Sequence, residues 1–500
     1  MMQGSKTEKI VSVVLAALMI FSVFAWQTNA VSFGAEVQNE TAVFKNAESG
    51  GNVIALTESR TFTAEILLNG DSFVSQTDID SGKIVWSLNR DSEKMYVDSE
   101  LFPHQTAGGP LSTWKTAEGA DFFYDIETSL KTEGENTYLC VTFKNNCYFG
   151  SDPSTTHSEG GDYLDICGYF NLEAEKNGRK IGAAAVKIVP YDSFHTMAEI
   201  YDEIDKMEEF ANQETDLYVK KFSMGQSSGV LYEPLDMPYL IIAGAEKDVA
   251  QWLAFTEEAE INPDKVLSDL ENGVCDDIKV PVMYSNIHAN EVSAPDGILK
   301  FAWMLLESAS SGKEIEYKEL TGFTADGKAQ LAAEHGPAGK AGSLAVPDLV
   351  AEKATYLGAI TDKNDGISGP VDLDKYYTSV TEKVSAETLL EDVFFIIVPE
   401  ENVEGRTYIT REASNGYDLN RDNSFQTTPE TQNMQKLIGT FNPVMMTEFH
   451  GRVEGYQVEP CDPPHEPNFE YDLLAEHLVA GGEAFGTAAV ANNDSYNSYV

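Results

Sequence analysis

Two histidines and one glutamate are the residues of this sequence whose types and spacing suit metal chemistry. His288 is followed three positions later by Glu291, and a second histidine, His450, stands far along the chain in a Glu-Phe-His-Gly stretch. A catalytic zinc ion takes three protein ligands of the histidine or carboxylate type and keeps one position for water, which it acidifies toward neutrality. We therefore predict that His288, Glu291 and His450 bind one zinc ion per chain. The alternative for each position is a structural side chain buried at the end of a strand.

A polar loop between the two metal-binding segments carries two arginines. Arg411 and Arg421 lie in the stretch 410–421, which follows an apolar run ending at Val398. The arginine fork binds a carboxylate through two parallel hydrogen bonds, so in an acidic chain this pair favours an anionic ligand. Ordinary salt bridges with the abundant Asp and Glu are the alternative.

The elements that must position these residues alternate between strands and helices. Apolar runs typical of buried strands occupy 239–243, 280–284, 393–398 and 444–449, and helical patterns occupy 297–307 and 430–441. This alternation predicts an α/β fold with a mixed, largely parallel sheet flanked by helices. His288 and His450 each follow a strand, where ligand sites of such sheets are expected.

The rest of the chain divides into an export signal, a β-rich region and an insertion. Lys6 and Lys9 precede an apolar run over 10–26 and a small-residue cleavage site at 28–30, which predicts a signal peptide at 1–30. An uncleaved anchor helix is the alternative. Short β-rich runs between turn residues predict a sandwich-like accessory domain over 36–190, before the α/β domain of 195–500. A polar surface insertion is expected at about 307–385.

Composition limits which partners the protein is expected to bind and in which compartment it is expected to act. The formal net charge of −47 repels nucleic acid and anionic membranes, so we expect neither as a partner once the signal peptide is removed. Together with the signal peptide, this indicates a secreted, extracellular protein. The five cysteines are too few and too scattered for a disulfide-framed scaffold, and because no Cys-x-x-Cys pair occurs, a thiolate zinc site is not expected.

The order of these motifs resembles that of a known family. His-x-x-Glu, then an arginine with Asp-Leu-Asn-Arg, then Phe-His-Gly make residues 195–500 similar to the zinc metallocarboxypeptidases related to carboxypeptidase A, as a secreted bacterial member. The stretch 224–229 is similar to the family's Gly-x-Ser turn. The stretch 399–406 resembles its Asn-Pro-Asp-Gly-Arg segment, with Val403 and Glu404 in place of Pro and Asp.

The resemblance implies a role for each candidate residue. It makes His288, Glu291 and His450 the zinc ligands, Asn420 and Arg421 the clamp on the terminal carboxylate of a peptide substrate, and Arg411 the group that polarises the scissile carbonyl. The implied activity is that of a zinc metallopeptidase, which hydrolyses peptide bonds near a free C-terminus through metal-activated water.

One part of the family pattern is missing, which leaves alternatives open. The family's general-base glutamate lies well downstream of the third ligand, so we expect this sequence to be truncated, with the base and the specificity pocket beyond Val500. A non-catalytic extracellular binding protein that keeps the zinc fold is one alternative. An amide deacylase of the same fold is another.

Overall fold

A computed structural model describes most of the chain between Ala42 and Asn492. The described residues are 42–44, 52–68, 74–91, 106–148, 166–192, 194–229, 234–335, 372–408, 410–450 and 480–492. The predicted signal peptide at 1–30 and the middle of the predicted insertion, 336–371, lie outside them. Among the described residues, no helix combines the length and the apolar composition that a bilayer span requires.

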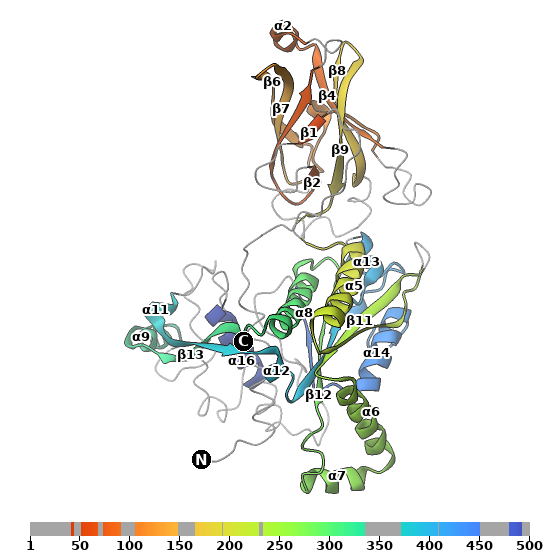
Figure 1. Cartoon of the computed structure of the whole chain (residues 1–500), viewed down its shortest axis with the longest axis vertical. Helices are drawn as coiled ribbons and strands as arrows, with labels where there is room; N and C mark the ends of the chain where they lie inside the picture. Colours follow the sequence, from red (N-terminus) through yellow and green to blue (C-terminus); the bar gives the residue numbers. More distant parts are fainter. Residues whose placement is uncertain are drawn as a thin grey trace.

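The first part of the chain forms two sheets, which lie at one end of the long axis (Figure 1). Their orders are β1-β3-β7-β6 and β2-β9-β8-β4-β5, and every pairing is antiparallel except that of β2 with β9. The elements are β1 (Ala42–Phe44), β2 (Val53–Ala55), β3 (Thr61–Leu67), α2 (Gln76–Asp80), β4 (Ile84–Arg90), β5 (Gly108–Pro110), η1 (Leu111–Thr113), β6 (Phe123–Glu133), β7 (Asn136–Asn145), β8 (Gly168–Lys176) and β9 (Arg179–Val189).

Both of these sheets contribute to one hydrophobic core. Alternate residues of β8 and β9 are buried, as the pleat requires, and Phe62 of β3 stacks on Phe143 of β7 with ring centroids 5.3 Å apart. The turn between β8 and β9 is built from Asn177 and Gly178, both at positive φ (53° and 77°), which matches the twist of a tight hairpin. None of the four cysteines in the described residues forms a disulfide.

The second part of the chain is a helix-covered sheet with a smaller two-stranded sheet beside it. Its elements are α5 (Met197–Glu214), β10 (Tyr218–Gln226), β11 (Asp236–Ala243), α6 (Glu246–Ile261), α7 (Pro263–Glu271), β12 (Val280–Ser285), α8 (Ser293–Ser311), β13 (Ile315–Phe323), α9 (Ala325–His335), α11 (Leu373–Tyr376), β14 (Tyr377–Val384), α12 (Ala386–Leu389), β15 (Val393–Val398), α13 (Val403–Tyr408), η3 (Leu419–Arg421), α14 (Pro429–Phe441), β16 (Met445–Glu448) and α16 (Ala480–Asn492).

The larger sheet is mixed rather than largely parallel. Its order is β10-β11-β15-β12-β16, in which β12 pairs in parallel with β15 and β16, whereas β10, β11 and β15 pair antiparallel. The short connection between β10 and β11 makes a hairpin, because parallel neighbours need a longer crossover. The prediction of a mixed α/β fold is confirmed, and its parallel part is the part that carries the candidate ligands.

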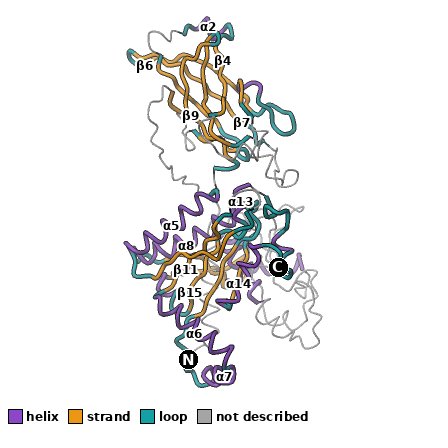
Figure 2. Tube along the Cα trace, turned by 90° about the vertical axis from the view of Figure 1, so that its right-hand side faces the viewer, coloured by secondary structure: helices purple, strands orange, loops and turns teal. Residues whose placement is uncertain are grey.

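Helices cover both faces of this sheet (Figure 2). Helix α5 contacts α8 in one layer, and α6 contacts α14 in the other. Every residue of the middle strand β15 is fully buried, which explains its unbroken apolar sequence. In the predicted insertion, β13 and β14 form an antiparallel pair of their own, with α9 and α11 beside it.

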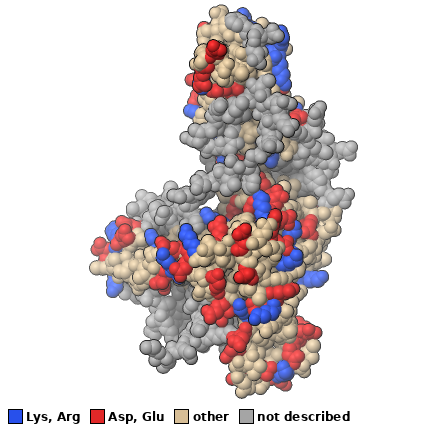
Figure 3. Space-filling view, in the orientation of Figure 1, with Lys and Arg blue, Asp and Glu red and all other residues tan. Residues whose placement is uncertain are grey.

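Acidic side chains dominate the charge of the chain. On the face drawn in Figure 3, Asp and Glu side chains are spread over both parts of the molecule, with Lys and Arg between them. Several lysines pair with these acids, such as Lys220 with Glu208 at 2.6 Å and Lys265 with Asp269 at 2.9 Å. Part of the positive charge is therefore already neutralised locally.

Candidate metal site

The parallel pairing of β12 and β16 brings the two candidate histidines to one edge of the sheet. Ser285, the last residue of β12, is the register partner of Glu448, the last residue of β16, and Phe449 N donates to Ser285 O at 2.8 Å. His288 follows β12 and His450 follows β16, so both emerge at the same place. Glu291 joins them because a tight turn, in which its N–H donates to His288 O at 2.9 Å, returns the chain toward His288 just before α8.

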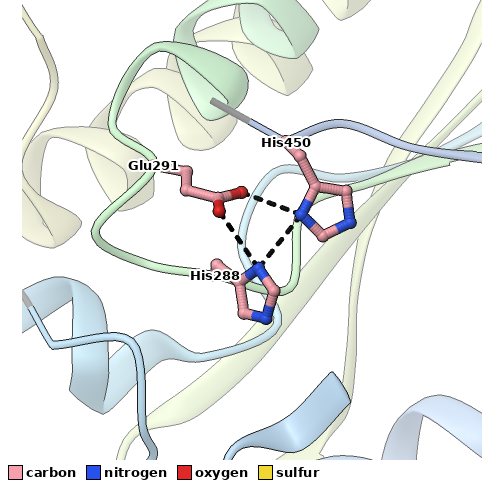
Figure 4. Close-up of side chains that lie close together, drawn as sticks. All are labelled: His288, Glu291 and His450. Carbon is pink, nitrogen blue, oxygen red and sulfur yellow. Dashed lines mark hydrogen bonds and ion pairs between the residues drawn. The ribbon is translucent and has the colours of Figure 1, made fainter. Parts of the chain in front are cut away.

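The side chains of these three residues point toward one common point (Figure 4). The Nδ1 atoms of His288 and His450 lie 3.0 Å apart, and Glu291 places Oε1 at 3.3 Å from the first and Oε2 at 2.8 Å from the second. One ligand atom from each residue lies within 4.8 Å of the others. The sequence prediction thus named three side chains that are neighbours in the structure.

The donor set fits a zinc ion. Two imidazole nitrogens and one carboxylate are ligands that zinc prefers in catalytic sites. Ligand atoms at about 2.0–2.2 Å from one tetrahedral zinc ion are roughly 3.3 Å from each other. The observed separations of 2.8 to 3.3 Å require only small outward shifts to match this geometry.

Burial and charge keep Glu291 ionised. His288 and Glu291 are buried, while His450 is more exposed. Burial by itself would raise the pKa of Glu291, but hydrogen bonds and positive charge from His288 and His450 outweigh it and hold this pKa well below its ordinary value. In turn, hydrogen bonds to Glu291 and Glu448 raise the pKa of His450 to about 9.

Asp418 supports His288 from the side opposite the cluster. Its Oδ1 lies 3.2 Å from His288 Nε2, the nitrogen that points away from Glu291 and His450. A carboxylate at this nitrogen fixes the tautomer and orientation of a metal-binding histidine. Burial would raise the pKa of Asp418, yet the hydrogen bond and charge of Arg411 hold it below its usual value. Sequence analysis did not single out Asp418, although it stands at the start of the Asp-Leu-Asn-Arg motif.

Glu448 has a similar relation to His450. Its Oε2 lies 3.4 Å from His450 Nε2, the nitrogen remote from Glu291. The buried Glu401 lies beside Glu448, and burial followed by the negative charge of Glu448 raises the pKa of Glu401 well above its ordinary value. Both histidines therefore have a carboxylate at the distal nitrogen. No local spacing in the sequence pointed to Glu401 or Glu448.

Arg411 adjoins the cluster, whereas the other two predicted polar residues lie beyond Asp418. Arg411 donates through Nε to Asp418 at 2.9 Å, and its Nη1 lies 3.2 Å from His288 Nδ1 and 3.6 Å from Glu291 Oε1. Asn420 donates its backbone N–H to Asp418 at 2.9 Å, and the exposed Arg421 donates to Asn420 O at 2.9 Å. Within the described residues, no hydrogen bond joins Asn420 or Arg421 to the three clustered side chains.

Comparison with known proteins adds no relative: the chain matches no protein-family model, and a search of curated proteins finds no match.

Proposed function

We propose that this chain is a secreted zinc metallopeptidase of the carboxypeptidase type. The observation that carries the proposal is the convergence of His288, Glu291 and His450 at the end of two parallel strands, with Arg411 beside them. We also propose that the helix-covered sheet is a zinc carboxypeptidase-like fold and that the two N-terminal sheets form a sandwich-like accessory domain. The shared core of those two sheets and the helices on both faces of the mixed sheet support this assignment.

The proposed reaction is hydrolysis of a peptide bond near a free C-terminus. A bound zinc ion would acidify a water molecule and stabilise the negative charge that develops on the carbonyl oxygen. Arg411 lies at the edge of the cluster, so its guanidinium would add positive charge to the same oxygen. Asn420 and Arg421 would bind the terminal carboxylate, which supplies proximity and orientation. The exposure of Arg421 leaves its fork accessible to such a ligand.

The first test is the zinc content of histidine variants. His288→Ala and His450→Ala are each expected to lose zinc retention, measured by metal analysis after gel filtration, because each removes one of three ligands. His335→Ala, at the end of α9, is the matched control and should retain the wild-type stoichiometry. Full stoichiometric zinc in both ligand variants would remove the proposed site.

The second test separates the clamp from the metal. Arg421→Ala should weaken the binding of a peptide with a free C-terminal carboxylate by about 10- to 100-fold, because a hydrogen bond to a charged group contributes roughly 1.5–3 kcal/mol. The amidated form of the same peptide is the control, and its binding should change little. Titration calorimetry with zinc-free protein, which cannot hydrolyse the peptide, measures both. Equal losses for the two peptides would exclude the clamp.

A further inference from the structure

One buried arginine outside the metal cluster binds the turn that carries two of its members. Arg406 of α13 is 1% exposed, and its Nη1 donates to Ala289 O while its Nη2 donates to Val292 O, both at 3.2 Å. Ala289 directly follows His288, and Val292 directly follows Glu291. A single guanidinium therefore holds the backbone directly after each of the two ligands.

The same guanidinium also binds the residues that lead in from the β-rich part of the chain. The β9–α5 connection, residues 190–192 and 194–196 in the described structure, presents His195 O to both Nε of Arg406 at 3.1 Å and Nη2 at 2.5 Å. The ring of Tyr191 lies against the guanidinium, with its centroid 5.1 Å from Cζ. Arg406 thus joins the β9–α5 connection to the ligand turn.

Asp296 closes the arrangement from the first turn of α8. Its Oδ1 lies 2.7 Å from His195 Nδ1, and its carboxylate accepts the backbone N–H of His195 at 3.2 Å. Its Oδ2 lies 3.5 Å from Nη2 of Arg406. The helix that begins just after Glu291 is therefore linked to the same connection.

Burying the guanidinium of Arg406 costs free energy, so its position calls for a structural reason. Removing a guanidinium from water carries a large desolvation penalty, which hydrogen bonds and nearby negative charge must offset. The planar fork of arginine can bind three carbonyl groups from two segments at once, whereas a lysine ammonium offers a single point of charge. Ligands of a metal site must be held in position by their surroundings, and loss of such support weakens metal binding.

We propose that Arg406 is a positioning residue for the metal site and couples metal binding to the order of the β9–α5 connection. The proposal rests on the zinc site of the proposed function and adds to it a route by which the β9–α5 connection supports the site. Coupling between two regions is reciprocal. If the connection helps to fix the ligand turn, a bound metal must help to fix the connection.

The variant test is Arg406→Lys, compared with a matched arginine in the β-rich part. Arg90 also donates to two backbone carbonyls, Thr106 O at 2.7 Å and Cys167 O at 2.9 Å, and lies 4.6 Å from the ring centroid of Phe170. Zinc affinity, measured by competition with a chromophoric chelator, should fall about 10- to 100-fold in Arg406→Lys and stay within about twofold of wild type in Arg90→Lys. Wild-type affinity in a folded Arg406→Lys protein would overturn the proposal.

A second measurement needs no variant at Arg406. Hydrogen exchange of the wild-type protein with and without added zinc should show slower exchange at His195, whose N–H is bonded to Asp296, as well as at 288–292. The amides of β4 are the internal control and should not respond. Protection of 288–292 without any change at His195 would refute the coupling while leaving the zinc site intact. If the wild-type protein bound no zinc, and its hydrogen exchange in the presence of zinc were identical to that of His288→Ala, the proposed function and this inference would both be overturned.

Discussion

The two parts of the molecule differ most in what they bury. Within the described residues, the β-rich part buries aromatic and aliphatic side chains with few polar ones: Glu65, Asp78, Ser87, Thr116 and Asn145. The helix-covered sheet buries a much larger polar set, gathered near the ends of its strands, including His288, Glu291, Glu400, Glu401, Glu404, Arg406, Asp422 and Glu430. Burying charge costs free energy, and the buried charges of the helix-covered sheet lie in the region of the candidate metal site.

The buried acids of the two parts also differ in how they are compensated. Asp78 in the β-rich part pairs with Lys176 at 2.8 Å and Lys83 at 3.3 Å. In the helix-covered sheet, Glu400 and Glu404 each leave one buried oxygen with no hydrogen-bond partner among the described residues. The buried acid of the first part is therefore paired, whereas these two acids of the second part each keep an uncompensated oxygen that lowers stability.

The largest expected effect tests whether packing in the β-rich part is independent of the metal site. Phe62→Ala should lower the free energy of unfolding by about 3–5 kcal/mol, because it opens a cavity in a fully buried aromatic stack. Zinc affinity of the folded variant should remain that of the wild type. Phe395→Ala in β15 is the matched change in the other part, and it should lower both quantities. Denaturant unfolding and chelator competition measure them. A loss of zinc affinity in Phe62→Ala would show that packing in the β-rich part is not independent of the metal site.

The next effect concerns a buried charge near the site. Burial raises the pKa of Glu400 to about 8, although the positive charge of Arg406 and the N–H of Asn402 oppose the rise. The folded chain therefore binds a proton here that the unfolded chain releases above its ordinary pKa of about 4.5, and stability falls as pH rises from there to about 8. The free energy of unfolding of Glu400→Gln should exceed that of wild type by a few kcal/mol at pH 8 and equal it at pH 4. Denaturant unfolding with a chelator present measures both values. An equal gain at both pH values would refute the assigned titration.

The smallest expected effect concerns the carboxylate behind His288. Asp418→Ala should weaken zinc binding by about 10- to 100-fold, since the imidazole loses the acceptor that orients it. Asp418→Asn keeps the shape of the acceptor without its charge and should fall between this variant and wild type. Asp125→Asn, an exposed acid of the β-rich part that pairs with Lys144, is the control. Unchanged affinity in Asp418→Ala would mean that His288 is oriented by other contacts.

Periodicity and apolar runs predicted the main elements of the helix-covered sheet well. The apolar runs at 280–284 and 393–398 correspond to β12 and β15, and the helix expected at 430–441 is α14 at Pro429–Phe441. These predictions succeeded because continuous burial of a strand, or one buried face of a helix, imposes a local pattern.

The features that sequence analysis missed depend on contacts between distant segments. The antiparallel pairing of β11 with β15 joins two strands that lie far apart in the chain, so it leaves no local pattern. Asp418 acts through a ring nitrogen of His288. Arg406 acts through backbone carbonyl groups, which every segment of a folded chain offers. The three candidate ligands were found because their residue types and the His-x-x-Glu spacing suit a metal, whereas the side chains that support them are ordinary for an acidic protein.

The distance along the chain between the two histidines has a consequence for the order of folding. His288 and His450 are 162 residues apart in sequence, and they meet only when β16 has paired with β12. Closing so long a segment carries a loop entropy that local structure does not repay. In a zinc finger the ligands lie close together and the metal drives folding, whereas at the site proposed here the sheet would have to assemble before an ion could bind.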